Sequence, residues 1–211
     1  ICHRLEQPKK NVKLNLVSKC HPRWSKQQYM DAFDEVQEYI KAGDCYQINL
    51  TQEFKAKVEG SLLSQAQALW DLTHAPYAGY LNISNFELLS CSPELFIEFQ
   101  AERKIKTRPI KGTMPRFNDP EQDQISKNKL SQSEKDQAEN VMIVDLLRND
   151  LSVYAETGSV KTPKLFNIES FNQVHHMVSE VQATLKKDVN PFNVLMSALP
   201  GGSITGAPKI R

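Results

Sequence analysis

The sequence has no apolar run long enough to cross a bilayer, so no membrane-spanning helix is expected. Its 26 basic and 25 acidic residues are interspersed and leave a formal net charge of only +1. That balance gives no electrostatic reason to expect nucleic acid or an acidic membrane as a partner. The first residue is Ile1 and no secretory pattern follows it, so we expect a fragment or a processed product.

Cysteine is scarce and scattered. Cys2, Cys20, Cys45 and Cys91 form no C-x-x-C pair, which argues against zinc sites and thioredoxin-type chemistry. We therefore predict four reduced packing residues and a cytoplasmic location.

What is present predicts an ordinary globular domain of 211 residues, 40% apolar and 24% charged. Capping-box spacing predicts a helix that begins at Ser25 and another at Ser131, the latter with Glu134 as its partner. Further helices are expected over 64–73 and after Asn190-Pro191, where proline occupies the first helical position.

Alternating or β-rich segments predict strands at 46–54, 79–83, 86–91, 95–99, 104–110, 160–166 and 173–185. The polar stretch 117–129 is predicted to be a mobile loop. Because helices and strands are grouped, we predict an α+β fold with largely antiparallel sheets flanked by helices. Residues 1–211 are expected to form a single domain.

Lys111 stands at the predicted end of an extended run, against a turn at Gly112-Thr113. The cations Lys106 and Arg108 precede it. Like charge and burial both favour a neutral amine, which is nucleophilic. The alternative is an edge strand that ends in a solvated lysine, and local physics alone favours that alternative.

Three acidic residues are candidates for chemistry. Asp136 and Glu139 share one helix face and could supply carboxylates to Mg2+; the alternative is a solvated acidic turn that complements the helix dipole. Glu94 precedes a strand and is either a general acid or a loop-edge glutamate.

Two further segments could serve a site. His175 and His176 are adjacent in a predicted strand, so they face opposite sides and one is expected to point inward. The segment from Gly201 to Lys209 is not a phosphate loop, because Ala207-Pro208 separates its glycine from its lysine. It is either an anion-binding turn or a sharp turn between helices.

Six segments occur in the order typical of chorismate-utilising enzymes, and together they identify the chain as resembling that family over nearly all residues after Ser25. They are Gly43-Asp-Cys-Tyr-Gln-Ile-Asn-Leu50, Ser92-Pro-Glu-Leu-Phe96, Thr107-Arg-Pro-Ile-Lys-Gly-Thr113, Asp136-Gln-Ala-Glu-Asn-Val-Met-Ile-Val-Asp-Leu-Leu-Arg-Asn-Asp150, His176-Met-Val-Ser179 and Pro200-Gly-Gly-Ser-Ile-Thr-Gly-Ala-Pro-Lys209. Lysine at 111 resembles the aminodeoxychorismate synthases, because anthranilate synthases have alanine there. Gln47 replaces the lysine base of the family's water-adding members.

The resemblance implies amination of chorismate at C4, for 4-aminobenzoate and folate synthesis, with ammonia from a glutamine amidotransferase subunit. It implies Lys111 as a nucleophile at C2, Glu94 as general acid and His176 in an orienting or proton-transfer role. It also implies that Glu139, with Asp136, binds Mg2+. Further groups are expected to hold substrate oxygens: Gly112, Thr113, Gly202 and Ser203.

Family members continue at both ends, so the resemblance implies the central part of a catalytic domain that lacks N-terminal strands and a C-terminal part. We expect this piece alone to be inactive. Two alternatives stay open. One is the anthranilate synthase reaction, against which Lys111 argues; the other is a non-catalytic fragment that only binds a partner or ligand.

Overall fold

The computed structural model describes residues 12–208. The chain divides into two compact units, one of Ile1–Glu35 and Leu50–Pro93, the other of Val36–Asn49 and Glu94–Arg211. Every strand pairing described is antiparallel. The predicted α+β class with antiparallel sheets is therefore confirmed. Within residues 12–208, no helix combines the length and the apolar character that a bilayer crossing requires.

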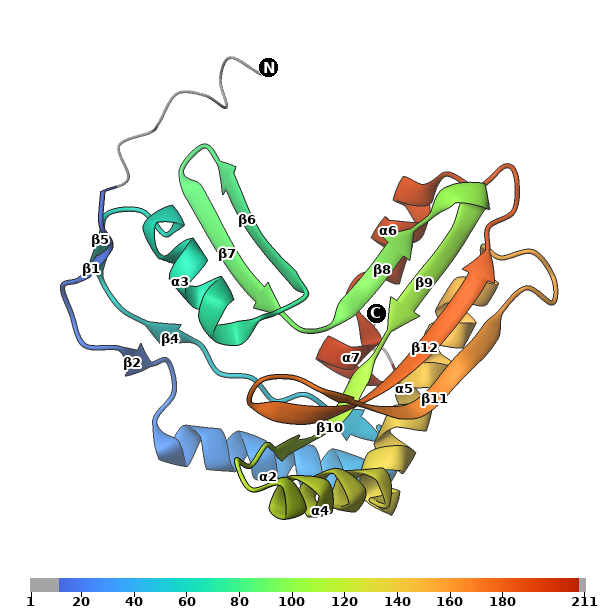
Figure 1. The fold of residues 1–211 in the computed structure, drawn as a ribbon, viewed down its shortest axis with the longest axis horizontal. Coiled ribbons are helices and arrows are strands. Elements are labelled where there is room, and N and C mark those ends of the chain that lie inside the picture. Colours follow the sequence, from blue (N-terminus) through green and yellow to red (C-terminus); the bar gives the residue numbers. More distant parts are fainter. Residues whose placement is uncertain (1–11, 209–211) are drawn as a thin grey trace. The chain divides into compact units, whose positions relative to one another are not determined.

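The first unit is built on a hairpin of β6 (Tyr77–Ile83) and β7 (Phe86–Ser92), which pair along their whole length. Helix α3 (Leu63–Thr73) lies beside this hairpin (Figure 1), and the indole N–H of Trp70 donates to the Ser90 carbonyl over 3.2 Å. Two short pairs complete the unit: β1 (Asn15–Leu16) with β5 (Val58–Glu59), and β2 (His21–Pro22) with β4 (Phe54–Lys55).

Helix α2 (Lys26–Ala42) begins as its sequence predicts. The Ser25 N–H donates to Gln28 Oε1 over 2.9 Å, and the Gln28 N–H donates to Ser25 Oγ over 3.2 Å. This reciprocal pair is a capping box. The helix stops before Gly43, whose φ of +82° suits glycine better than other residues.

The second unit is organised around its longest strand, β12 (Val174–Thr184). The partners of β12 are β10 (Ile110–Pro115), β9 (Lys104–Arg108) and β11 (Lys161–Ser170), and β8 (Leu95–Phe99) extends the sheet beyond β9. The short turn η1 (Ala101–Arg103) joins β8 to β9.

Helix α5 (Glu134–Ser152) packs on this sheet and builds the core of the second unit (Figure 1). Its buried apolar side chains meet those of β9 and β12 and one from α6 (Pro191–Ala198). The buried cluster consists of Ile105, Ile143, Val144, Leu147, Leu151, Ala155, Val181, Ala183, Leu185 and Val194. Helix α6 begins as predicted, because Asn190 Oδ1 accepts the Phe192 N–H over 2.9 Å.

The prediction of a mobile loop over 117–129 is wrong, because helix α4 (Pro120–Ser131) occupies most of this stretch. Asp119 caps this helix and Pro120 follows, so the Asn-Asp-Pro signal marks a helix start. Only Ser126 and Leu130 of α4 are buried, which leaves little apolar periodicity to detect. The predicted cap of α5 is also wrong: Ser133, not Ser131, accepts the Asp136 N–H.

The strand predicted over 46–54 is confined to β3 (Gln47–Ile48) and, in the other unit, β4. Strand β3 pairs with β13 (Gly206–Ala207), which follows the short helix α7 (Gly202–Thr205). A Cβ at Gly206 would lie 2.1 Å from the Gln47 carbonyl oxygen, so this contact requires glycine. The three cysteines within the described residues, Cys20, Cys45 and Cys91, are free thiols; Cys2 lies outside them.

Candidate functional site

Lys111 lies inside a strand rather than at the end of one, which corrects the prediction of a turn at Gly112-Thr113. Ile110 pairs with Val178 and Thr113 pairs with His176, so Lys111 and Gly112 together face the single residue Met177. This two-against-one register is a β-bulge, a feature that redirects side chains and is common beside active sites. Gly112 has a φ of +85°, which explains why glycine follows the lysine.

Gly112 also lets β10 touch the helices. A Cβ built on Gly112 would lie 2.9 Å from Asp136 Cβ and 3.0 Å from Leu130 Cδ1. The hydroxyl of Ser133 caps the same turn of α5, because its Oγ accepts the Asp136 N–H over 3.3 Å. The bulge therefore lies directly against the half-buried Asp136 side chain, at the N-terminal end of α5.

Glu94 and His176 flank the bulge along β10. Glu94 Oε1 accepts the Ile110 N–H over 3.3 Å, one residue before Lys111. His176 Nδ1 lies 2.9 Å from Thr113 Oγ1, and its ring makes an edge contact with Phe171. Burial lowers the pKa of His176, partly opposed by a hydrogen bond to the Gly112 backbone. The lowered pKa favours the neutral imidazole, which can both donate and accept a proton.

The two cations that precede Lys111 are paired with carboxylates. Lys106 Nζ lies 2.9 Å from Glu98 Oε2. Arg108 is bound by Glu169, and its Nε lies 3.5 Å from Glu180 Oε2. These carboxylates offset the positive field that the sequence predicts around Lys111.

Asp136 and Glu139 are the candidate Mg2+ ligands, and they lie three residues apart on α5. Glu139 is 34% exposed, and its Oε1 is 3.6 Å from Lys135 Nζ, a weak surface pair that leaves the carboxylate accessible. Mg2+ usually takes one or two protein carboxylates and completes its shell with water and substrate oxygens. The donor set fits that requirement, although no group of three His, Cys, Asp or Glu side chains within residues 12–208 could hold an ion by itself.

The glycine-rich segment near the C-terminus belongs to the same unit. Gly202 is buried at the start of α7, which lies against α5, and the Ser203 side chain lies outside what the structure describes. A Cβ at Gly201 would lie 3.2 Å from the Phe96 ring, so this turn packs closely on β8. The prediction of a simple turn between helices over this segment is wrong, because its described residues form α7 and β13, while Lys209 lies outside them. Its use as an anion site stays a prediction.

The sequence did not indicate a second polar cluster, centred on the buried His175. His175 Nδ1 lies 2.8 Å from Ser170 Oγ, and its Nε2 lies 3.0 Å from Asp123 Oδ1. Hydrogen bonds from Arg116, from the Phe117 N–H and from His175 lower the pKa of Asp123 to about 2. The prediction that one of the two adjacent histidines points inward is confirmed. Its partner Asp123 could not be found from the sequence, because the segment around it was predicted to be a loop.

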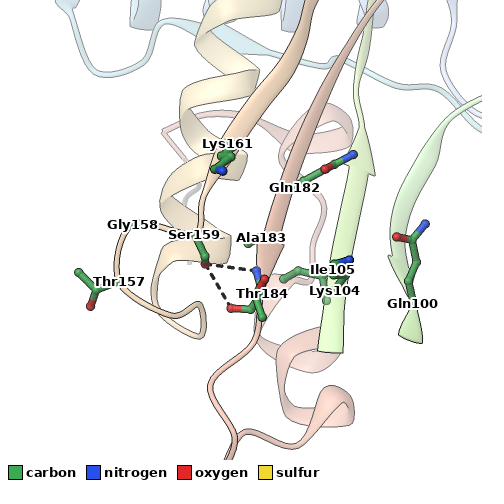
Figure 2. A pocket seen from close by; sticks show the side chains of 10 residues that line it. All are labelled: Gln100, Lys104, Ile105, Thr157, Gly158, Ser159, Lys161, Gln182, Ala183 and Thr184. Carbon is green, nitrogen blue, oxygen red and sulfur yellow. Dashed lines mark hydrogen bonds between the residues drawn. The ribbon is translucent and has the colours of Figure 1, made fainter. Parts of the chain in front are cut away.

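A hollow of about 310 Å³ lies elsewhere on the sheet of the second unit (Figure 2). Its wall carries two lysines and no carboxylate, and Ser159 Oγ donates there to the Glu156 and Thr184 carbonyls. The lining residues are Gln100, Lys104, Ile105, Thr157, Gly158, Ser159, Lys161, Gln182, Ala183 and Thr184. None of the predicted site residues lines this hollow.

Known proteins share both the sequence and the fold. Residues 2–211 match the chorismate binding enzyme family. The chain is 46% identical over 196 residues to aminodeoxychorismate synthase component 1 of Klebsiella aerogenes, covering 93% of this chain and 43% of that protein. It is 39% identical over 188 residues to anthranilate synthase component 1 of Bacillus subtilis, covering 89% of this chain and 36% of that protein.

A solved structure of anthranilate synthase component I from Streptococcus pneumoniae superposes with a TM-score of 0.83 at 27% identity, covering 99% of this chain and 46% of that one. The chain thus spans less than half the length of these relatives. Because the family model matches residues 2–211, nearly the whole chain, this chain belongs to the chorismate binding enzyme family.

Proposed function

We propose that the protein that carries this chain aminates chorismate to 4-amino-4-deoxychorismate, with ammonia as the nitrogen source. The observation that supports this most is the Lys111–Gly112 bulge, which lies against Asp136 and between Glu94 and His176. The 46% identity to an aminodeoxychorismate synthase component 1 favours the same reaction. The product would serve 4-aminobenzoate and folate synthesis in the cytoplasm.

In the proposed first step, Lys111 Nζ forms a bond to C2 of the ring. The two ring double bonds shift toward C4, and the C4–O bond breaks. Glu94 gives its proton to the departing hydroxyl, which leaves as water, and neutral His176 can take the proton released by the lysine nitrogen. In the second step ammonia bonds to C4 and the double bonds shift back. Protonated His176 returns its proton to the lysine nitrogen, so that Lys111 leaves C2 as the neutral amine with the electron pair of the C–N bond. The nitrogen now on C4 gives up one proton to the Glu94 carboxylate, which restores both groups.

Asp136 and Glu139 would hold the divalent ion. When bound, Mg2+ supplies charge neutralisation and Lewis acidity toward a substrate carboxylate. Gly112, Thr113, Gly202 and Ser203 would hold other substrate oxygens, through backbone N–H groups where a side chain is lacking. Both acidic residues lie on α5, three positions apart, and the Asp136 side chain is the one that lies against Gly112 of β10.

A separate glutamine amidotransferase subunit would supply the ammonia. The name "component 1" of the K. aerogenes relative implies that this relative works with another component. The alternative reaction is that of an anthranilate synthase component 1, which also eliminates pyruvate; the 39% identity to the B. subtilis protein keeps it open.

Product analysis separates these alternatives. The full-length protein is incubated with chorismate, Mg2+ and an ammonium salt, and the products are resolved by chromatography with fluorescence detection. We expect aminodeoxychorismate and no fluorescent anthranilate. Formation of anthranilate would establish the alternative reaction. If neither product forms, with or without an amidotransferase, only a binding role is left for the protein.

A further inference from the structure

Two polar side chains, outside the residues assigned above, are completely buried between helix and sheet. Asn140 on α5 and Ser179 on β12 each have 0% exposure. Ser179 Oγ donates to Asn140 Oδ1 over 2.5 Å, and Asn140 Nδ2 donates to the Met177 carbonyl over 3.3 Å. Buried polar groups of this kind are stable only where each finds its partner, so the pair defines one arrangement of α5 on β12.

The same pair reaches the strands on both sides of β12. Ser179 Oγ accepts the Phe166 N–H over 3.1 Å, which ties in β11. The Ser179 N–H donates to the Pro109 carbonyl over 3.1 Å, immediately before β10. Met177, whose carbonyl Asn140 binds, is the residue that faces the Lys111–Gly112 bulge. The hydrogen bonds of Asn140 and Ser179 therefore reach the residue opposite the bulge, Met177, and the residue before β10, Pro109.

The position of Asn140 on α5 links these contacts to the two candidate metal ligands. It lies one turn after Asp136 and directly after Glu139, so its orientation fixes the rotation of both acidic residues about the helix axis. The apolar contacts of Ile143, Val144 and Leu147 are less directional and would tolerate a small rotation or slide. The hydrogen bonds of Asn140 would not.

We propose that Asn140 and Ser179 form a positioning clamp, which fixes the rotation of α5, and with it the positions of Asp136 and Glu139, relative to the Lys111–Gly112 bulge. The effect of the clamp on catalysis rests on the proposed function. Its effect on the structure of β10 is independent of that function. Neither side chain needs to touch the substrate. The clamp acts by keeping the carboxylates and the lysine in one geometry, on which proximity effects in catalysis depend.

The decisive variant is the double substitution N140L/S179A in the full-length protein. The double substitution leaves no unpaired side-chain polar group, but the Phe166 N–H and the Met177 carbonyl each lose one hydrogen bond. We therefore expect a moderate loss of stability in a protein that still folds. Two quantities are measured: kcat for chorismate amination, and hydrogen exchange of the β10 peptide, with the β6–β7 peptide as internal reference. Ser126→Ala is the control, because it removes a different helix-to-strand hydrogen bond, between α4 and β10, 2.7 Å from Ser126 Oγ to the Pro115 carbonyl.

We expect the double variant to lose about 10- to 100-fold in kcat, the usual effect of disturbing the groups behind a metal ligand. We also expect faster exchange in β10 but not in β6–β7, and little change in kcat for S126A. If kcat or β10 exchange of the folded double variant equals that of wild type, the clamp is refuted. Should the double variant not fold, kcat and β10 exchange are measured for S179A alone, and wild-type values of either would refute the clamp.

The two proposals fail in different ways. If wild type does not aminate chorismate but β10 exchange rises in the double variant, the proposed function is wrong and the structural clamp stands. If wild type is active and both measurements are unchanged in the double variant, the function stands and the clamp is wrong.

Discussion

Gly112→Ala is the substitution that probes the bulge most sharply. Glycine is required there for two separate reasons, the φ of +85° and the approach of Asp136 and Leu130. A residue with a Cβ pays about 1–2 kcal/mol to adopt a left-handed conformation. The contacts at 2.9 and 3.0 Å add an overpacking cost of about 1–3 kcal/mol. The expected loss of unfolding free energy is therefore about 2–5 kcal/mol, the sum of the two ranges.

Gly158→Ala provides a matched control. Gly158 has a φ of +77°, but no atom lies within 4 Å of a Cβ built there. Its substitution should cost only the backbone part, about 1–2 kcal/mol. The difference between the two variants isolates the contact with Asp136 and Leu130. The difference corresponds to about 1–3 kcal/mol, so full-length G112A should melt below full-length G158A.

The assay combines thermal unfolding with steady-state amination of chorismate. A displaced Asp136 should lower kcat of G112A on the order of 100-fold, whereas G158A should keep wild-type kcat. Equal melting temperatures for the two variants would refute the close contact between Gly112 and α5. Equal kcat values in the presence of the stability difference would refute the role of that contact in catalysis.

Three further predictions follow from hydrogen bonds of the second unit. Ser133→Ala should destabilise the protein by about 1 kcal/mol in urea unfolding, because it removes the cap of α5, whereas Ser131→Ala should cost clearly less; equal losses would place the cap elsewhere. The lowered pKa of Asp123 means that its ionised form stabilises the fold above its ordinary pKa of 3.8, and that this stabilisation is lost as the pH falls through about 2. The difference in unfolding free energy between wild type and Asp123→Asn should thus stay constant from pH 7 to about pH 4 and narrow between about pH 4 and pH 2. A difference that stays constant over that lower range would contradict the assignment. Glu94→Gln should lower kcat for amination by about 100-fold or more if Glu94 protonates the leaving hydroxyl, and a change below tenfold would exclude that role.

The parts of the fold that the sequence predicted correctly depend on local signals. The capping box at Ser25 and Gln28 and the proline after Asn190 each specify a helix start through contacts within a few residues. Helix α4 was not predicted, because it lies on the surface with only Ser126 and Leu130 buried and so has no apolar periodicity. Its stability comes from the N-cap and from its contacts with β10, which no periodicity reveals.

The candidate site shows the same division. The family resemblance predicts Lys111, Asp136 and Glu139 as site residues, and that assignment stays a prediction. The bulge could not be predicted, because it depends on the register in which β10 pairs with β12. The partnership of His175 with Asp123 joins residues 52 positions apart. That of Ser179 with Asn140 spans 39 positions. Long-range polar pairs of this kind have no spacing rule, so only the folded structure reveals them.

The central claim is that the amine of Lys111 bonds to the chorismate ring. It is tested most directly by mass spectrometry of the full-length protein after incubation with chorismate and Mg2+ in the absence of any ammonia source. The account predicts a mass increase equal to chorismate less one water, located on the β10 peptide and absent from Lys111→Ala. An adduct that persists in Lys111→Ala, or a wild-type protein that aminates chorismate yet never carries the adduct, would contradict it.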